Sequence, residues 1–347
     1  MIHVTRPETL TSQPEQHALK RVLAADIGGT NSRFCFVETD GCHTINMGPT
    51  FTMSTRQPGV SSFEQYWSLV QQSAPAGFFR TGNVDAIALA VAGTVSGQSA
   101  LLPNIDWNIE PGDLPSEPPL FLINDFTAQG YALLVKSERN NLSLIRGGSP
   151  AADGSTAVVG AGTGLGHCVL HPTEEAGLVA PKEGNPGTHR LIFGSESGHA
   201  VFPFQGEEEM ALAKRWIKLA GKPWLSNDDV VSGPGAASLN QCLSGKNETA
   251  AEILSREDTD IVSWFSRFYA RACRNYCLAV FPVKELVISG GIAAKNPHLV
   301  SSKDFTESFN DAGDYSPLFE NISILLNMNQ SLGLRGAAVY AARQFSP

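Results

Sequence analysis

Phe121-Leu-Ile-Asn-Asp-Phe-Thr-Ala-Gln-Gly130 is the stretch of sequence around which the rest of the chain can be interpreted. Its apolar start at 121–123 predicts the end of a buried strand, and residues 127–135 predict a helix. Asn124 and Asp125 lie between the two. A carboxylate at the end of a buried strand is unfavourable unless a polar partner meets it. Asp125 is therefore either a catalytic base or simply a cap for the helix that follows.

Length and charge limit the classes of protein that the chain can represent. A chain of 347 residues is long for a single core and predicts two domains. The net charge of −9 argues against a nucleic-acid surface, which requires clustered Lys and Arg. The same charge is compatible with ATP if backbone N–H groups and a metal ion hold the phosphates.

The cysteines and the start of the chain favour a cytoplasmic protein. The 6 cysteines are scattered without a C-x-x-C pair, which is typical of free thiols in a reducing compartment. The first 20 residues are polar, contain Pro7 and Pro14, and lack the apolar core of a signal peptide, so we expect a disordered tail. Since no apolar run is long enough to span a bilayer, we expect no membrane partner.

A glycine-tipped hairpin is predicted near the start of the chain. Residues 22–25 and 32–38 have strand character, and the turn between them contains Gly28 and Gly29. Asp26 leaves the first strand, while Thr30 and Asn31 add polar groups beside exposed backbone N–H donors. The segment is either an ordinary hairpin turn or a loop that holds phosphate without a lysine.

A second hairpin is predicted in residues 157–170, around Gly162-Thr163-Gly164. The dinucleotide pattern G-x-G-x-x-G fails in every frame, and no P-loop motif occurs, so backbone donors of the turn would have to hold any phosphate. Two such hairpins in one chain suggest an internal duplication with a cleft between the halves.

Polar residues bracketed by glycines form the segment Gly194-Ser-Glu-Ser-Gly-His199. Glu196 occupies the central position, so this is not the nucleophile elbow of a hydrolase. Glu196 and His199 lie between apolar residues 191–193 and 201–204, which predicts either a polar pair that faces a cavity or a solvated loop.

The remaining segments alternate strands and helices, as expected for an α/β protein. Strands are predicted at 84–91, 285–289 and 322–326, and helices at 61–72, 207–220, 261–281 and from about 333 to the end. We expect an acidic, solvated start at Glu207, Glu208 and Glu209. Surface loops or connectors are predicted at 171–190, 225–235 and 245–260. Gly290 and Gly291 after a buried strand would let a flat ligand approach the backbone.

In combination, these motifs resemble those of the bacterial glucokinases of the hexokinase–actin–chaperone ATPase superfamily, over residues 22–345. The resemblance implies two ribonuclease H-like α/β domains of the actin/hexokinase type that flank an ATP and sugar cleft. It places a disordered tail at 1–20, a small domain at 21–134 that is completed by the C-terminal helix 330–347, and a large domain at 135–329.

The resemblance also implies ATP-dependent phosphorylation of glucose at its 6-hydroxyl, with Asp125 as the base. Asp26 would hold Mg²⁺ through water, and Asp125, with an ordinary pKa near 3.9, would be ionised at pH 7. Residues expected to bind the sugar are Asn104, Asn124, Asp125, Glu196, His199 and Asp228. Residues expected to bind the nucleotide are Ala25, Asp26, Ile27, Gly28, Gly29, Thr30, Asn31, Gly162, Thr163, Gly164, Gly290 and Gly291.

One departure from the family leaves the identity of the sugar open. Asp228 stands where the family has a glutamate, and its side chain is shorter by one methylene. A kinase for mannose or fructose is therefore an alternative. A non-catalytic sugar- or ATP-binding regulator is less well supported, because the zinc loop and helix-turn-helix of the related repressors are missing from the sequence. The sequence is compatible with a homodimer but does not decide the oligomeric state.

Overall fold

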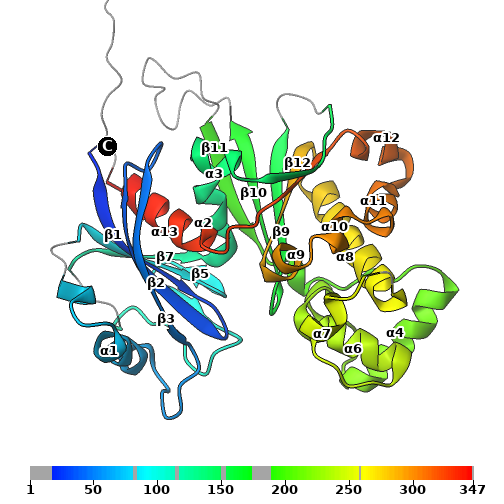
Figure 1. Cartoon of the computed structure of the whole chain (residues 1–347), viewed down its shortest axis with the longest axis horizontal. Coiled ribbons are helices and arrows are strands. Elements are labelled where there is room, and N and C mark those ends of the chain that lie inside the picture. The colour runs from blue at the N-terminus through cyan, green and yellow to red at the C-terminus, as the bar shows by residue number, and fades with distance from the viewer. Residues whose placement is uncertain are drawn as a thin grey trace, which may run out of the picture.

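Two β-sheets that share a five-stranded arrangement organise the computed structural model, which describes residues 18–80, 84–113, 117–149, 154–173, 189–257 and 259–345 (Figure 1). The strand order is β3-β2-β1-β4-β7 in the first sheet and β11-β10-β9-β12-β13-β8 in the second. In each sheet, three antiparallel strands are followed by two strands parallel to the first of them in the chain, and the second sheet adds β8, antiparallel to β13. This confirms the α/β class and agrees with the expected internal duplication.

The first sheet contains both strands predicted for the N-terminal hairpin. Its strands are β1 (Lys20–Ile27), β2 (Asn31–Thr39), β3 (Ile45–Ser54), β4 (Ala86–Val91) and β7 (Leu120–Asn124). All six residues of β4 are buried, as expected for a parallel strand covered on both faces. Strand β3 was not predicted, because it lies at the sheet edge and its residues are mostly exposed. A short hairpin of β5 (Thr94–Ser96) and β6 (Ser99–Leu101) follows β4.

The second sheet contains the second glycine-tipped hairpin. Its strands are β9 (Ser155–Ala161), β10 (Leu165–Thr173), β11 (His189–Ser195), β12 (Val283–Ser289), β13 (Ser323–Leu326) and β8 (Ser143–Arg146). The irregular loop expected at 171–190 is wrong at both ends, since His171 to Thr173 pair with His189 to Leu191. Residues 174–188 of that loop, and residues 1–17 of the expected tail, lie outside the described residues.

Helix α2 (Asp125–Ala132) is packed between helix α13 (Leu332–Arg343) and the second sheet (Figure 1). A Cβ added to Gly336 of α13 would lie 1.6 Å from the Ala128 carbonyl oxygen, so only glycine permits this helix contact. On the opposite side of α2, a Cβ added to Gly130 would lie 2.8 Å from Ile192 of β11. The helix that begins with Asp125 is therefore fixed from both sides.

The remaining helices lie around the two sheets (Figure 1). Near the first sheet are α1 (Phe63–Ser73) and η1 (Phe78–Arg80), and α3 (Lys136–Asn140) follows α2. The second half of the chain contains η2 (Ser197–His199), α4 (Gly206–Ala220), α5 (Asn227–Val230), α6 (Gly233–Ser244), α7 (Ala250–Leu254), α8 (Asp260–Ala279), α9 (Gly291–Lys295), α10 (His298–Ser301), α11 (Lys303–Asn310), η3 (Gly313–Tyr315) and α12 (Ser316–Phe319).

Two segments expected to be loops are partly helical. The segment 225–235 contains α5 and the first turn of α6, where the Ser232 hydroxyl accepts a hydrogen bond from the Gly235 N–H. Pro234 is favourable in such a first turn, because the N–H that it lacks has no partner within the helix. The segment 245–260 contains α7, which buries Ile253 and Leu254, so the expected solvated connector is also wrong.

Glu209 corrects the expectation of a solvated acidic start to α4. Its carboxylate is buried and pairs with the guanidinium of Arg271 in α8, at 2.8 Å from Oε1 to Nη2. Glu207 and Glu208 remain exposed, as expected. Glu209 therefore differs from Glu207 and Glu208 because it has a buried ion-pair partner on another helix.

The strands of the first sheet lie within residues 20–134, and those of the second within residues 135–329. Helix α13 packs against β1 and β4 of the first sheet, although it follows the second in sequence. The division into a small and a large domain with these limits stays a prediction. Among the described residues, no helix is both long and apolar enough to cross a bilayer.

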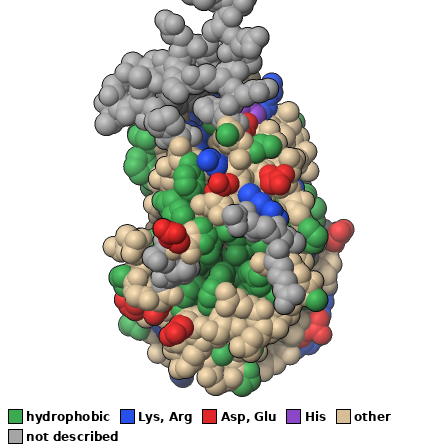
Figure 2. Space-filling view, turned by 90° about the vertical axis from the view of Figure 1, so that its left-hand side faces the viewer, with side chains coloured by type: hydrophobic (Ala, Val, Ile, Leu, Met, Phe, Trp, Pro, Cys, Tyr) green, Lys and Arg blue, Asp and Glu red, His purple; other side chains and the backbone are tan. Residues whose placement is uncertain are grey.

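Seen from the left-hand side of Figure 1, hydrophobic side chains gather in a hollow of the surface (Figure 2). On the first sheet, Phe36 of β2 and Phe51 of β3 line an apolar cavity together with Phe78 of η1. A second cavity, which is polar, lies between the two sheets.

Candidate active site

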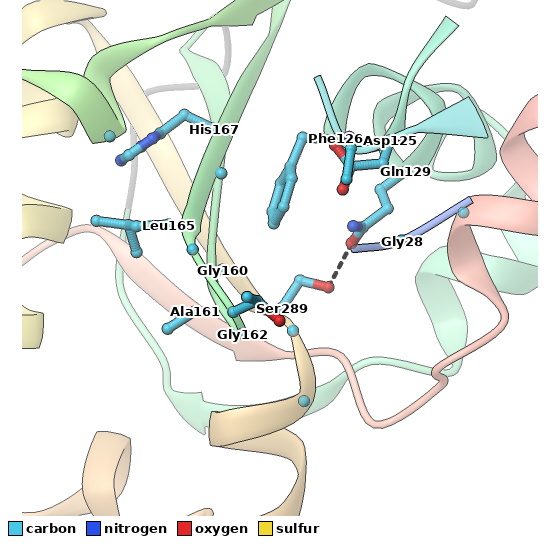
Figure 3. A pocket seen from close by; sticks show the side chains of 18 of the residues that line it. Gly28, Asp125, Phe126, Gln129, Gly160, Ala161, Gly162, Leu165, His167 and Ser289 are labelled. Carbon is cyan, nitrogen blue, oxygen red and sulfur yellow. Dashed lines mark hydrogen bonds between the residues drawn. The ribbon is translucent and has the colours of Figure 1, made fainter. Parts of the chain in front are cut away.

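The polar cavity has a volume of about 400 Å³ and is lined by the ends of strands from both sheets. Each of five segments contributes: the turn after β1, the β7–α2 junction, the turn after β9, the turn before η2 and the turn after β12. Figure 3 shows α2 on one side of the cavity and the second hairpin on the other. Segments far apart in the sequence therefore meet in one place.

Most of the predicted site residues line this cavity. All six residues expected at the sugar line it: Asn104, Asn124, Asp125, Glu196, His199 and Asp228. Eight of those expected at the nucleotide also do: Asp26, Gly28, Gly29, Gly162, Thr163, Gly164, Gly290 and Gly291. Ala25 and Ile27 are instead fully buried in the first sheet. Thr30 and Asn31 are exposed on the turn outside the cavity lining.

Asn124, rather than Asp125, caps helix α2. The Asn124 Oδ1 accepts hydrogen bonds from the N–H groups of Phe126 at 3.0 Å and Thr127 at 3.1 Å. Its Nδ2 donates to the Gly93 carbonyl at 3.1 Å and to Asp125 Oδ1 at 3.2 Å. Asp125 Oδ1 also accepts from the Phe126 N–H at 2.9 Å, whereas no hydrogen bond from the described residues engages Oδ2. The cap is thus supplied by the neighbouring residue, and one oxygen of Asp125 is available to a ligand.

The Asp125 carboxyl does not have an ordinary pKa. Burial raises its pKa to about 7, and the nearby carboxylates of Asp26 and Glu196 act in the same direction. The expected value near 3.9 is therefore wrong. A base whose pKa lies near neutral pH accepts a proton more readily than an ordinary carboxylate and is still substantially ionised there.

Asp26 projects from the end of β1 toward the same cavity. Burial raises the pKa of Asp26, while the Arg33 guanidinium, 3.5 Å away from Nη1 to Oδ2, lowers it. Arg33 was missed in the sequence, although it lies directly opposite Asp26 in the hairpin register. Once the turn is identified, the antiparallel register of a short hairpin places Arg33 opposite Asp26.

The second hairpin is shaped by contacts that exclude larger side chains. Its turn is closed by a hydrogen bond from the Gly162 N–H to the Gly164 carbonyl at 2.8 Å. A Cβ added to Gly166 would lie 1.9 Å from the Phe126 ring, so this side chain of α2 packs directly against the hairpin (Figure 3). A Cβ added to Gly162 would meet no atom within 4 Å, which leaves the turn backbone open to the cavity.

Glu196 and His199 are placed as the sequence predicted, side by side at the cavity. The distance from Glu196 Oε2 to His199 Nε2 is 3.7 Å, and both side chains are more than half exposed. The Thr94 hydroxyl, on β5 beside the first sheet, donates to Glu196 Oε1 at 3.0 Å. These side chains offer charged and polar groups to a ligand with several hydroxyls.

The turn after β12 requires its glycine. Gly290 has φ of +87°, and a Cβ there would lie 2.5 Å from the Ala161 carbonyl oxygen. Just before it, the Ser289 hydroxyl donates to Gln129 Oε1 at 2.5 Å (Figure 3). Gln129 was missed, although it lies four residues after Asp125 and therefore on the same face of α2.

His167 is another residue of the cavity lining that sequence reasoning missed. Its imidazole packs against the Tyr276 ring at 4.6 Å between centroids. Burial lowers its pKa to about 4, so the ring is neutral at pH 7. No motif identifies it, because its position depends on a helix more than a hundred residues further along the chain.

The possible metal ligands in the cavity suit Mg²⁺ only if phosphate oxygens bind the same ion. Among the described residues, no three or more His, Cys, Asp or Glu side chains are arranged to hold a metal by themselves. Asp26 supplies one carboxylate to the cavity. Mg²⁺ is commonly bound by one or two carboxylates together with phosphate oxygens and water, so the residues fit that mode.

Comparisons with known proteins agree on one family. The family model for glucokinase matches residues 23–344. A glucokinase from Nostoc punctiforme is 29% identical, over 93% of this chain and 99% of the relative. A glucokinase from Synechocystis is 28% identical, over 92% and 98% of the two chains. Among solved structures, Balamuthia mandrillaris glucokinase in complex with glucose has a TM-score of 0.74 at 18% identity, over 95% of each chain.

Proposed function

This chain belongs to the glucokinase family, and from that premise we propose that Asp125 is the general base for transfer of the ATP γ-phosphoryl group to the glucose 6-hydroxyl. The observation that carries the assignment is the position of Asp125 at the start of α2, in the lining of the cavity that both glycine hairpins share. The glycines of both hairpins and the Glu196/His199 pair line the same cavity as Asp125. Its raised pKa and free Oδ2 suit acceptance of a proton from a hydroxyl.

In the proposed reaction, the chain contributes position and charge. Phosphoryl transfer passes through a loose transition state, so alignment and charge neutralisation supply most of the acceleration. The open backbone of Gly162 and the glycines of the first hairpin would hold the phosphates, and Asp26 would hold Mg²⁺ through water. When bound, the ion neutralises charge on the phosphate oxygens. Asp125 orients the 6-hydroxyl and accepts its proton.

Other residues of the cavity lining hold the sugar. Glu196, His199 and Asp228 bind its hydroxyls, and Asn104 lies beside the first hairpin turn. Asn124 acts mainly by fixing Asp125, because its amide already makes hydrogen bonds within the protein. A polar contact left unpaired costs about 1–3 kcal/mol. Alanine at Glu196 should therefore raise the KM for the sugar and leave the KM for ATP nearly unchanged.

A kinase for mannose or fructose is the alternative, because Asp228 is shorter than the family glutamate. A panel of hexoses with ATP, monitored by ADP release, distinguishes the two. We expect the highest kcat/KM for glucose. A higher kcat/KM for mannose or fructose would show that this hexose, and not glucose, is the preferred substrate. An absence of ADP release with every hexose would favour a non-catalytic regulator.

A further inference from the structure

We propose that Asp228 is a positioning residue that joins the sugar side of the cavity to the second phosphate hairpin. One carboxylate oxygen anchors the hairpin, and the other is left for the sugar. This inference rests on the proposed function and adds a role in nucleotide binding to a residue expected to contact only sugar.

The anchoring contact is made at the exit of the hairpin. Asp228 Oδ1 accepts a hydrogen bond from the N–H of Leu165, the first residue of β10 after the Gly162-Thr163-Gly164 turn. A Cβ added to Gly164 would lie only 2.6 Å from the same oxygen. The carboxylate therefore packs directly against the turn that would carry the phosphates. No hydrogen bond from the described residues engages Oδ2.

Asp228 is free for this role because its neighbour Asp229 completes the capping box that begins the helix. In α5, Asp229 Oδ2 accepts from the Ser226 N–H at 3.0 Å, and the Ser226 hydroxyl accepts from the Asp229 N–H at 3.0 Å. Lys222 also donates to Asp229 Oδ1 at 2.5 Å. Two adjacent aspartates thus have separate partners: Asp229 stabilises the helix, and Asp228 faces the cavity.

The same short helix is tied to the turn that carries Glu196 and His199. The Asn227 N–H donates to the Ala200 carbonyl at 2.9 Å, and its Nδ2 donates to the Ser197 carbonyl at 2.8 Å. Gly198 of that turn packs against the hairpin exit, since a Cβ there would lie 2.2 Å from the Leu165 carbonyl oxygen. Helix α5 therefore holds the sugar side and the phosphate hairpin as one unit, with Asp228 at their junction.

This arrangement also gives a physical reason for aspartate at this position. The space between α5 and the hairpin is filled by the carboxylate itself, so a glutamate in the same place would have to displace Gly164 or turn away from Leu165. The shorter side chain keeps the hairpin contact and leaves the sugar to be reached by Oδ2.

Two substitutions separate the roles. Asp228→Asn retains an acceptor of the same size for the Leu165 N–H but removes the negative charge from the sugar side. Asp228→Ala removes both. Asp229→Asn is the matched control, because it changes the adjacent carboxylate without touching the cavity. Thermal unfolding identifies variants that do not fold, and Asp228→Ser, whose hydroxyl is one bond shorter, then replaces the alanine variant with the same expectation.

The experiment measures binding of Mg·ADP by calorimetry without sugar, together with the KM for ATP and for glucose. We expect Asp228→Ala to weaken Mg·ADP binding about tenfold, the scale of one lost hydrogen bond to a polar group, and Asp228→Asn and Asp229→Asn to remain within about twofold. Both Asp228 variants should raise the KM for glucose.

Unchanged nucleotide binding in Asp228→Ala would overturn the inference, and so would equal weakening in Asp228→Asn. If the unaltered protein bound Mg·ADP but failed to phosphorylate any hexose, the proposed function would fail, while the comparison of nucleotide binding among the variants would still decide the anchoring role.

Discussion

Ser289 at the end of β12 donates a hydrogen bond to Gln129 of α2, with 2.5 Å between Oγ and Oε1, and so links the second sheet to the helix that begins with Asp125. Ser289 in turn accepts from Asn327 Nδ2 at 2.9 Å, at the end of β13. Helix α2, the end of β12 and the segment that leads to α13 are therefore connected through side chains that line the cavity.

Gln129→Ala should lower kcat/KM, because α2 loses its polar anchor to the second sheet. The effect of one such bond is about 1 kcal/mol, or roughly fivefold. A double-mutant cycle with Ser289→Ala checks the cause: if the bond acts as described, the double variant is little worse than either single variant. Strictly additive losses would show that the two side chains act independently.

The pH dependence of kcat/KM should follow the ionisation of Asp125. The protonated carboxyl cannot accept a proton, and burial raises the pKa of this group to about 7. The value of kcat/KM should therefore rise with pH and level off above about pH 8. Rates measured from pH 5 to 9, with the fold checked by circular dichroism at each pH, provide the test. An acid limb with a midpoint near pH 4 would contradict the raised pKa.

Gly290→Ala should destabilise the protein, since the residue has φ of +87° and its Cβ would lie 2.5 Å from the Ala161 carbonyl oxygen. A non-glycine residue in such a conformation costs about 1–3 kcal/mol of unfolding free energy. Gly291→Ala is the control, because its Cβ would meet no atom within 4 Å. Urea unfolding should separate the two variants; equal stabilities would refute the strain at Gly290.

Glu209→Ala should be strongly destabilising, because it leaves the buried Arg271 guanidinium without its carboxylate. Removal of one partner from a buried ion pair costs about 3–5 kcal/mol. The exposed neighbour Glu208 provides the comparison, and Glu208→Ala should stay within about 0.5 kcal/mol. If chemical denaturation gave similar values for both variants, the buried pair would not be a major stabilising contact.

Local sequence patterns predicted what depends on neighbouring residues. Both glycine hairpins, the buried strand β4 and helix α8 follow from short-range periodicity and turn chemistry, and the structure confirms them. Each motif is also a local feature of the sequence, so the order of the motifs along the chain was sufficient to suggest the family.

Properties that depend on distant partners could not be predicted in this way. The burial of Glu209 requires Arg271 from another helix, and the raised pKa of Asp125 requires the surrounding protein and the Asp26 carboxylate. Helix α6 was missed because Gly-Pro-Gly indicates a turn, although the Ser232 cap makes the same residues a helix start. Tertiary contacts decided each of these cases.

The central claim is that Asp125 accepts the proton of the sugar hydroxyl, and the kcat of Asp125→Asn tests it most directly. Asparagine preserves size and the hydrogen bond from the Phe126 N–H, so unfolding and Mg·ADP binding should match those of the unaltered protein. Loss of a general base should lower kcat by about 10²–10⁴-fold. A variant that folds, binds nucleotide and retains more than about a tenth of the original kcat would contradict the assignment.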